Sequence, residues 1–169
     1  MENKLSTENE ENIVPEGFTI SMAVFDMLPV LCFFGTLITI YTDFKSVLFL
    51  VGSLLVFLGG FGKASWKLVI ALFHKNVYFL NRQMHYTMPA GWVIILVSLF
   101  IDRKKADFAG FFKGLITFPS IIFVIIAAAA IAMMVHFARH ADQYNAKSNW
   151  KEQITNLIAQ GAVWLAVLG

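Results

Sequence analysis

One acidic residue, Asp26, lies within the first long apolar run of the chain, three positions before Pro29. A carboxylate at the centre of a membrane-spanning helix costs about 2.5–3.5 kcal/mol, so such a group normally faces protein or water and marks a functional site. Because Pro29 lacks an N–H group, the carbonyl oxygen of Phe25 is left free beside the acid. This pair of residues predicts a proton or cation relay, or a contact with a substrate. The alternative is a buried ion pair with Lys63 or Lys67 that fixes the helix register.

The four histidines are the second group of candidates. His136 and His140 are one helical turn apart, a spacing that can chelate a metal ion. Adding His85 or His74 would make a three-histidine metal site or supply axial ligands to a haem. Histidine is also common at membrane surfaces, and the sequence has no HExxH motif and no series of HxxH or HxxHH motifs. No cofactor is therefore predicted, and a transition metal or haem remains the alternative.

Basic side chains could form a third site. Lys63 and Lys67, together with Trp66 and Arg82, could hold a phosphate or carboxylate headgroup. Arg139, at the end of a later apolar run, is expected near the same membrane surface. The alternative is anchoring, in which long basic side chains reach the headgroups and aromatic rings lie at the interface.

The composition indicates a membrane protein. Of the 169 residues, 58% are hydrophobic and only 14% are charged, whereas soluble domains contain about 45–50% apolar and about 25% charged residues. The net charge of +2 argues against nucleic acid as a partner. The single cysteine, Cys32, excludes an intramolecular disulfide.

The apolar blocks predict an all-α integral membrane protein, a helical bundle of four to five transmembrane spans. Residues 1–17 are acidic and we expect them to be disordered; residues 18–169 form one transmembrane domain. The expected spans cover residues 18–41, 47–73, 88–101 and 119–138. Residues 154–169 are apolar but short, and this run could span, re-enter or lie flat.

Short amphipathic helices are expected at the membrane surfaces. In residues 102–117 a basic cluster accompanies apolar side chains at helical spacing, which is typical of a helix lying on a membrane. A second such helix is predicted within residues 74–87. Small residues predict close helix packing. They are Gly52, Gly59, Gly60 and Gly62 in the second span, and Ala128 and Ala132 in the fourth, where the run Ala127–Ala130 widens the flat face.

Alternating spans place the candidate residues near one membrane surface. We call the surface on the N-terminal side of the bundle side A and the opposite surface side B. Asp26 is expected about 12 Å below side A and Lys63 about 6 Å below it, so the two could pair within the membrane. Side A is predicted to carry seven basic residues near the spans and side B five, which favours a cytoplasmic N-terminus. They are Lys63, Lys67, Lys75, Arg82, Arg139, Lys147 and Lys151 on side A, and Lys45, Arg103, Lys104, Lys105 and Lys113 on side B.

These features favour a small transporter or channel-like component that handles an ion, a small solute or a lipid. Asp26 would bind the coupling proton or cation, and the basic groups of side A would form a vestibule. Because a single copy makes a thin pathway, a homo-oligomer or a partner membrane subunit is expected in the bilayer. One alternative is a membrane-embedded metal or haem enzyme that uses the side A histidines. The other is a non-catalytic accessory subunit of a membrane complex.

Overall fold

The computed structural model describes residues 19–140 and 145–169, apart from the side chains of residues 138, 140 and 146. The acidic segment predicted to be disordered, residues 1–17, lies wholly outside the described residues. The described ranges are mainly helical and contain no strand, which confirms the predicted all-α bundle. The elements are α2 (Ile20–Phe44), α3 (Val47–Phe73), α4 (Tyr78–Arg82), α5 (Met84–Ile101), the short 3-10 helix η1 (Arg103–Lys105), α6 (Phe108–Ile116), α7 (Ser120–His140) and α8 (Ala146–Leu168).

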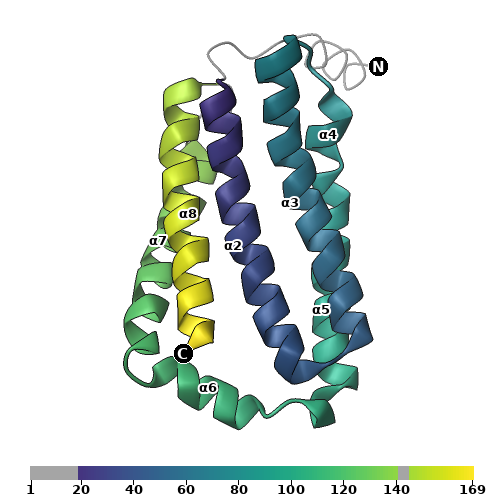
Figure 1. Cartoon of the computed structure of the whole chain (residues 1–169), viewed down its shortest axis with the longest axis vertical. Helices are drawn as coiled ribbons and strands as arrows, with labels where there is room; N and C mark the ends of the chain where they lie inside the picture. The colour runs from purple at the N-terminus through teal and green to yellow at the C-terminus, as the bar shows by residue number, and fades with distance from the viewer. Residues whose placement is uncertain (1–18, 141–144) are drawn as a thin grey trace.

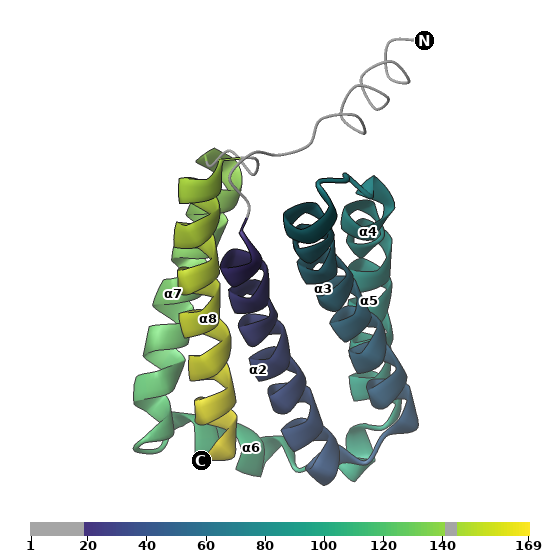
Figure 2. The ribbon, with the colours of Figure 1, turned by 45° about the horizontal axis from the view of Figure 1, so that its top comes forward.

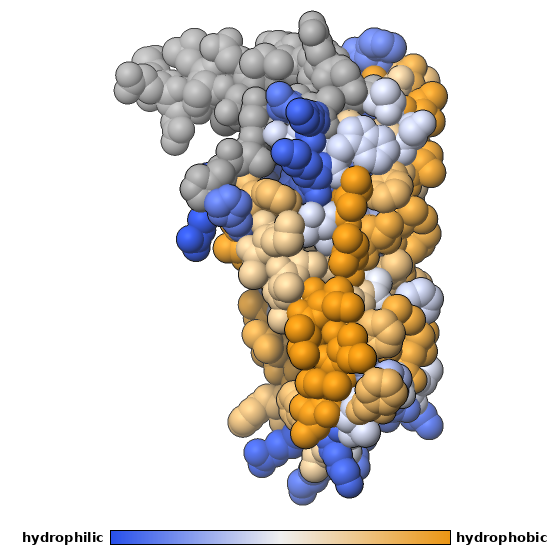
Figure 3. Space-filling view, turned by 90° about the vertical axis from the view of Figure 1, so that its left-hand side faces the viewer, coloured by the Kyte–Doolittle hydropathy of each residue, from blue (hydrophilic) through white to orange (hydrophobic). Residues whose placement is uncertain are grey.

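Four stretches within the described residues are long and apolar enough to cross a membrane, so the chain is a membrane protein. They are Ile20–Phe44, Val47–Phe73, Tyr78–Ile101 and Ser120–Phe137. The third is 24 residues long, because α4 and the first turn of α5 extend the short span predicted for residues 88–101. Figure 3 shows, on one side of the bundle, a hydrophobic band between two hydrophilic ends.

The long helices form two closely packed pairs with α2 between them (Figures 1 and 2). One pair is α3 with α5, the other is α7 with α8, and α2 contacts both α3 and α8. The final apolar run is part of α8, a helix of 23 residues that lies along α7 and α2. It therefore packs along the bundle, although α8 is not among the four stretches that are long and apolar enough to cross a membrane. The short helix α6 crosses the side B end of the bundle (Figure 1).

Small residues determine how closely each pair approaches. A Cβ atom on Gly91 of α5 would lie 2.7 Å from the carbonyl oxygen of Gly52 on α3 and 2.9 Å from the backbone nitrogen of Val56. The predicted glycine surface of α3 therefore faces α5 at this point. On α7 the predicted pair Ala128 and Ala132 is exposed, whereas Ala127 and Ala130, in the alanine run predicted to widen the flat face, are buried.

At side B, a hydrogen-bond chain joins the start of α3 to the end of α5. The Ser46 hydroxyl caps α3 by accepting a hydrogen bond from the Phe49 N–H at 3.2 Å, and it donates to Asp102 Oδ2 at 2.6 Å. Lys105 Nζ lies 2.8 Å from the other carboxylate oxygen. Hydrogen bonds from Lys105 and Ser46 favour the charged carboxylate and lower the pKa of Asp102 below its usual value.

The approach of α3 and α5 can be tested with two glycine substitutions. Gly91→Ala should destabilise the bundle by about 1–3 kcal/mol, because the added methyl group meets backbone atoms that cannot move away. Gly161→Ala on α8 is the matched control, since a Cβ at that position meets nothing within 4 Å. It should be neutral or stabilising by up to about 1 kcal/mol. Unfolding of the purified variants in detergent measures both, and equal stabilities would contradict the packing described.

The lowered pKa of Asp102 predicts a pH dependence with a definite sign. Because the carboxyl is more acidic in the folded chain, its stabilising contribution is present above the ordinary pKa of 3.8. That contribution is lost as the pH falls through the lower folded-state value. The difference in melting temperature between the wild type and Asp102→Asn should therefore shrink as the pH is lowered through the folded-state pKa of Asp102. A difference that stays constant would contradict a contribution from the charged carboxylate.

Candidate functional site

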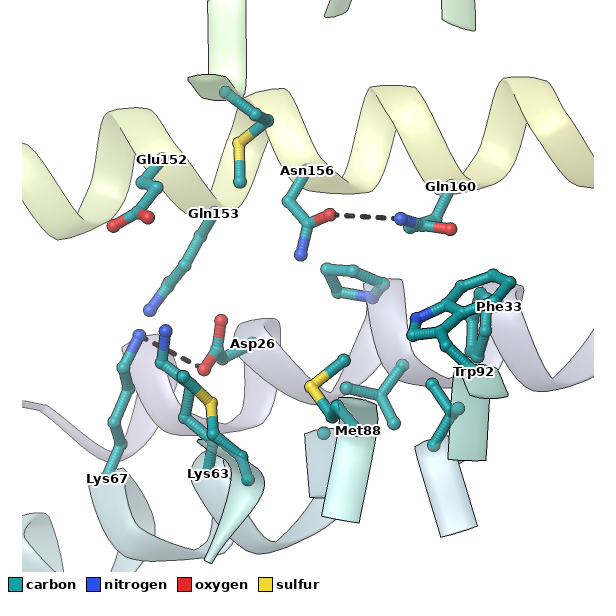
Figure 4. Close-up of a pocket in the computed structure, with 16 residues that line it drawn as sticks. Asp26, Phe33, Lys63, Lys67, Met88, Trp92, Glu152, Gln153, Asn156 and Gln160 are labelled. Carbon is teal, nitrogen blue, oxygen red and sulfur yellow. Dashed lines mark hydrogen bonds and ion pairs between the residues drawn. The ribbon is translucent and has the colours of Figure 1, made fainter. Parts of the chain in front are cut away.

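The candidate site begins with a buried ion pair between α2 and α3. Lys67 Nζ lies 3.0 Å from Asp26 Oδ2, and the two side chains are 5% and 13% exposed. With the Gln153 amide oriented to satisfy both neighbours, its oxygen accepts a hydrogen bond from Lys67 Nζ at 2.9 Å. Its nitrogen donates to the Met22 carbonyl oxygen at 3.2 Å. The pair is thus held by three helices, and Figure 4 shows Gln153 reaching down from α8 toward it.

The predicted partner of Asp26 was Lys63, and the structure pairs it with Lys67 instead. Asp26 is six residues after the start of α2, and Lys67 is six residues before the end of α3. At 1.5 Å per residue, both lie about 9 Å from the side A ends of these antiparallel helices. Lys63 is one turn deeper. The alternative prediction, a buried pair with Lys67, therefore has the correct geometry. The predicted depth of Lys63 assumed a membrane core of about 30 Å, and α3, with 27 residues, is longer than that.

Polar side chains of α8 form the opposite wall. Gln153, Asn156 and Gln160 are spaced by three and four residues, which places them on one helical face. The Gln160 side-chain nitrogen donates to the Asn156 oxygen at 3.4 Å. Asn156 and Gln160 were missed by the sequence interpretation, because residues 154–169 were treated as a uniform apolar run. Their helical spacing was the signal that could have identified them.

Between these walls lies a cavity of about 420 Å³, which we call the side A cavity. Its charged lining residues are Asp26, Glu152, Lys63 and Lys67, two of each sign. Figure 4 shows both lysines extending from α3 toward Asp26 and α8. Within the described part of the chain, Lys63 and Glu152 form no ion pair of their own. Both charges are therefore available to a ligand.

The deeper part of the side A cavity has no charged side chain, and its polar group is Gln160, beside two aromatic rings. Pro29 lines it one turn below Asp26, and Phe33 and Trp92 lie at its deeper end. The two aromatic rings have their centroids 6.0 Å apart. The cavity can therefore accommodate a charged or polar group near Asp26 and a less polar one deeper in the bundle.

The other predicted site residues do not line this cavity. Arg82 is exposed at the end of α4, and Arg139 is exposed near the end of α7. Trp66 is buried and donates from Nε1 to Asn76 Oδ1 at 2.8 Å. It therefore fastens the loop after α3, and the predicted headgroup site of Trp66, Arg82 and the two lysines is not assembled in this structure.

The histidines considered for the alternative metal or haem site are not brought together among the described side chains. His74, His85 and His136 are exposed on three different helices or helix ends, and the His140 side chain lies outside the described residues. The described residues include no group of three or more His, Cys, Asp or Glu that could hold a metal ion.

Comparison with known proteins finds no matching family model, no matching curated protein and no matching solved structure.

The coupling of the buried pair can be measured with a double-mutant cycle. Asp26→Asn should lower stability by about 3–5 kcal/mol, because it leaves the Lys67 ammonium buried without its counter-charge. Combining it with Lys67→Met should restore much of this loss, since no charge is then stranded. Asp43→Asn is the control, because Asp43 is exposed at the other end of α2 and should change stability by less than about 0.5 kcal/mol. If the double variant lost as much unfolding free energy as the two single variants together, the coupling would be contradicted.

Proposed function

We propose that this membrane protein is a small transporter whose side A cavity binds a polar group of its substrate. The observation that supports this is the position of the Asp26–Lys67 pair, which is buried among apolar helices and also lines a cavity of about 420 Å³. Ionisable groups at such depth are costly, and they commonly mark substrate, ion or proton pathways. In this proposal Asp26 is the group that gains and loses the coupling proton or cation.

In this proposal Asp26 and an anionic group of the substrate compete for the ammonium group of Lys67. When Asp26 is charged, it holds the ammonium group together with Gln153. When a proton or cation neutralises Asp26, Lys67 is released toward an anionic group in the cavity, where Lys63 is already unpaired among the described residues. Protonation would thus be linked to substrate binding, since each changes the affinity of the other.

A second candidate is an accessory subunit in which the pair only specifies assembly. The observation in its favour is that Asp26, Lys67 and Gln153 satisfy one another across α2, α3 and α8, as expected of a group that fixes helix register. In either case we expect the protein to act in the lipid bilayer with a second copy or a partner subunit. The N-terminus is proposed to be cytoplasmic because of the predicted excess of basic residues on side A.

Transport can be tested in proteoliposomes with an imposed pH gradient and a panel of radiolabelled polar solutes and fluorescent lipids. The wild type and Lys104→Gln, which removes an exposed charge outside both cavities, should move at least one member faster when the gradient is present. The variant that combines Asp26→Asn with Lys67→Met, compared at equal amounts of folded protein, should lose the effect of the gradient. If that variant folds and the wild type moves no member of the panel, the accessory-subunit candidate is favoured. A gradient effect that persists without Asp26 would overturn its proposed role.

A further inference from the structure

A second, larger cavity of about 980 Å³ lies in the side B half of the bundle, and we call it the side B cavity. It extends between α2, α5, α6 and α8 and is lined largely by aliphatic and aromatic side chains. Its charged lining residues are Asp43, Lys45, Lys105 and Asp107. These four lie at or next to helix ends at the side B surface, so the charged groups are at the edge of the cavity, and its interior is apolar apart from Thr36 and Gln160.

The apolar face of α6 contributes to this cavity instead of to a packed core. Phe108, Phe111 and Leu115 line the cavity, yet α6 has no buried residue. The helix is capped by the Asp107 side chain, which accepts a hydrogen bond from the Gly110 N–H at 3.0 Å. A stable helix therefore covers the end of the cavity while its aromatic rings remain available to an apolar ligand.

The side A and side B cavities adjoin. Phe33, Trp92 and Gln160 line both of them. Along α2, Asp26 in the first cavity and Phe44 in the second are 18 residues apart, which corresponds to about 27 Å. The two cavities therefore meet at the Phe33–Trp92 pair and together follow most of the length of the bundle.

This arrangement distinguishes among the substrates considered from the sequence. An ion or hydrophilic solute that left the side A cavity would have to enter an apolar space, where desolvation of a charge or polar group is costly. The uncharged polar groups there are already engaged in part, since the Thr36 hydroxyl donates to the Cys32 carbonyl oxygen at 3.1 Å and the Gln160 side-chain nitrogen donates to Asn156 at 3.4 Å. A molecule with a polar end and an apolar chain meets suitable surroundings in both cavities.

We propose that the substrate is an amphiphile, with a zwitterionic head in the side A cavity and a hydrocarbon chain in the side B cavity, the chain passing beside the Phe33–Trp92 pair where the two cavities meet. The inference rests on the proposed function only in stating that the bound amphiphile is transported. Its binding can be tested separately. The head is zwitterionic because the cavity has two charges of each sign, and Lys63 and Glu152 are not ion-paired among the described residues. Lys63 binds the anionic group of the head and Glu152 binds the cationic group.

The test measures binding to the full chain in amphipol with a lysophosphatidylcholine brominated along its chain, which quenches tryptophan fluorescence on contact. Quenching should saturate at about one molecule per chain, and Trp92→Phe should remove most of the saturable part. Unbrominated lysophosphatidylcholine should compete. Glycerophosphocholine, the head without the chain, should fail to compete even at about hundredfold excess.

Variants test each cavity separately. Lys63→Met and Glu152→Gln should each weaken binding about tenfold, because each removes a charged partner of the head. Val163→Phe, which places a larger side chain in the lining of the side B cavity, should weaken it similarly without adding a tryptophan. Gly114→Phe serves the same purpose if Val163→Phe does not fold, since Gly114 lines that cavity and a Cβ there meets nothing within 4 Å. Ile125→Phe on the exposed face of α7 is the control and should bind normally.

The proposal is overturned if quenching does not saturate, if glycerophosphocholine competes as well as the lysolipid, or if the cavity-filling variant binds normally. Saturable binding without any transport in proteoliposomes would instead refute the transport function and leave the amphiphile site intact. Transport of a hydrophilic solute without lysolipid binding would refute the amphiphile site and leave the transport function intact.

Discussion

The buried ion pair between Asp26 and Lys67 is the constraint on which the arrangement of three helices depends. Removing two charges from water is costly, and their attraction offsets that cost only when the geometry is good and the remaining hydrogen-bonding groups are satisfied. Here the distance is 3.0 Å and Gln153 supplies the further hydrogen bond. Sliding α3 by one turn would bring Lys63 to the level of Asp26 and separate Lys67 from Gln153. The pair therefore fixes the register of α2 against α3 and the depth of α8.

The two helix pairs account for the position of the cavities. Glycine brings α3 close to α5, and buried alanines on α7 and α8 face inward where these two helices pack. Such smooth surfaces pack well in lipid, where the hydrophobic effect does not drive helices together. The space between the pairs is bridged by α2 and the polar side chains of α8. Both cavities lie in that space, so the same packing that stabilises each pair leaves room for a ligand between them.

Several features were predictable because they depend on local spacing. The apolar runs predicted the spans, and the spacing of Phe108, Phe111, Phe112 and Leu115 predicted the amphipathic helix α6. Asp26 could be selected because a lone carboxylate in an apolar run is costly wherever the helix packs. The extent of the third span was less predictable, because polar residues before Met88 continue a helix that only tertiary contacts stabilise. The contribution of α8 was missed for a related reason, since its polar residues are separated by apolar ones in the sequence and gather only on the folded helix.

The sequence by itself determined that this is a helical membrane protein with an acidic group in its first span and amphipathic character at one surface. These properties follow from residue type and periodicity, which act within one helix. Only the tertiary structure decided that Lys67 and not Lys63 pairs with Asp26, and that Gln153 completes the pair. It also decided that Phe33 and Trp92 stand between two cavities of different polarity. Such choices depend on the relative depth and rotation of helices far apart in the chain, and a difference of one turn, about 5.4 Å, is enough to exchange one partner for another.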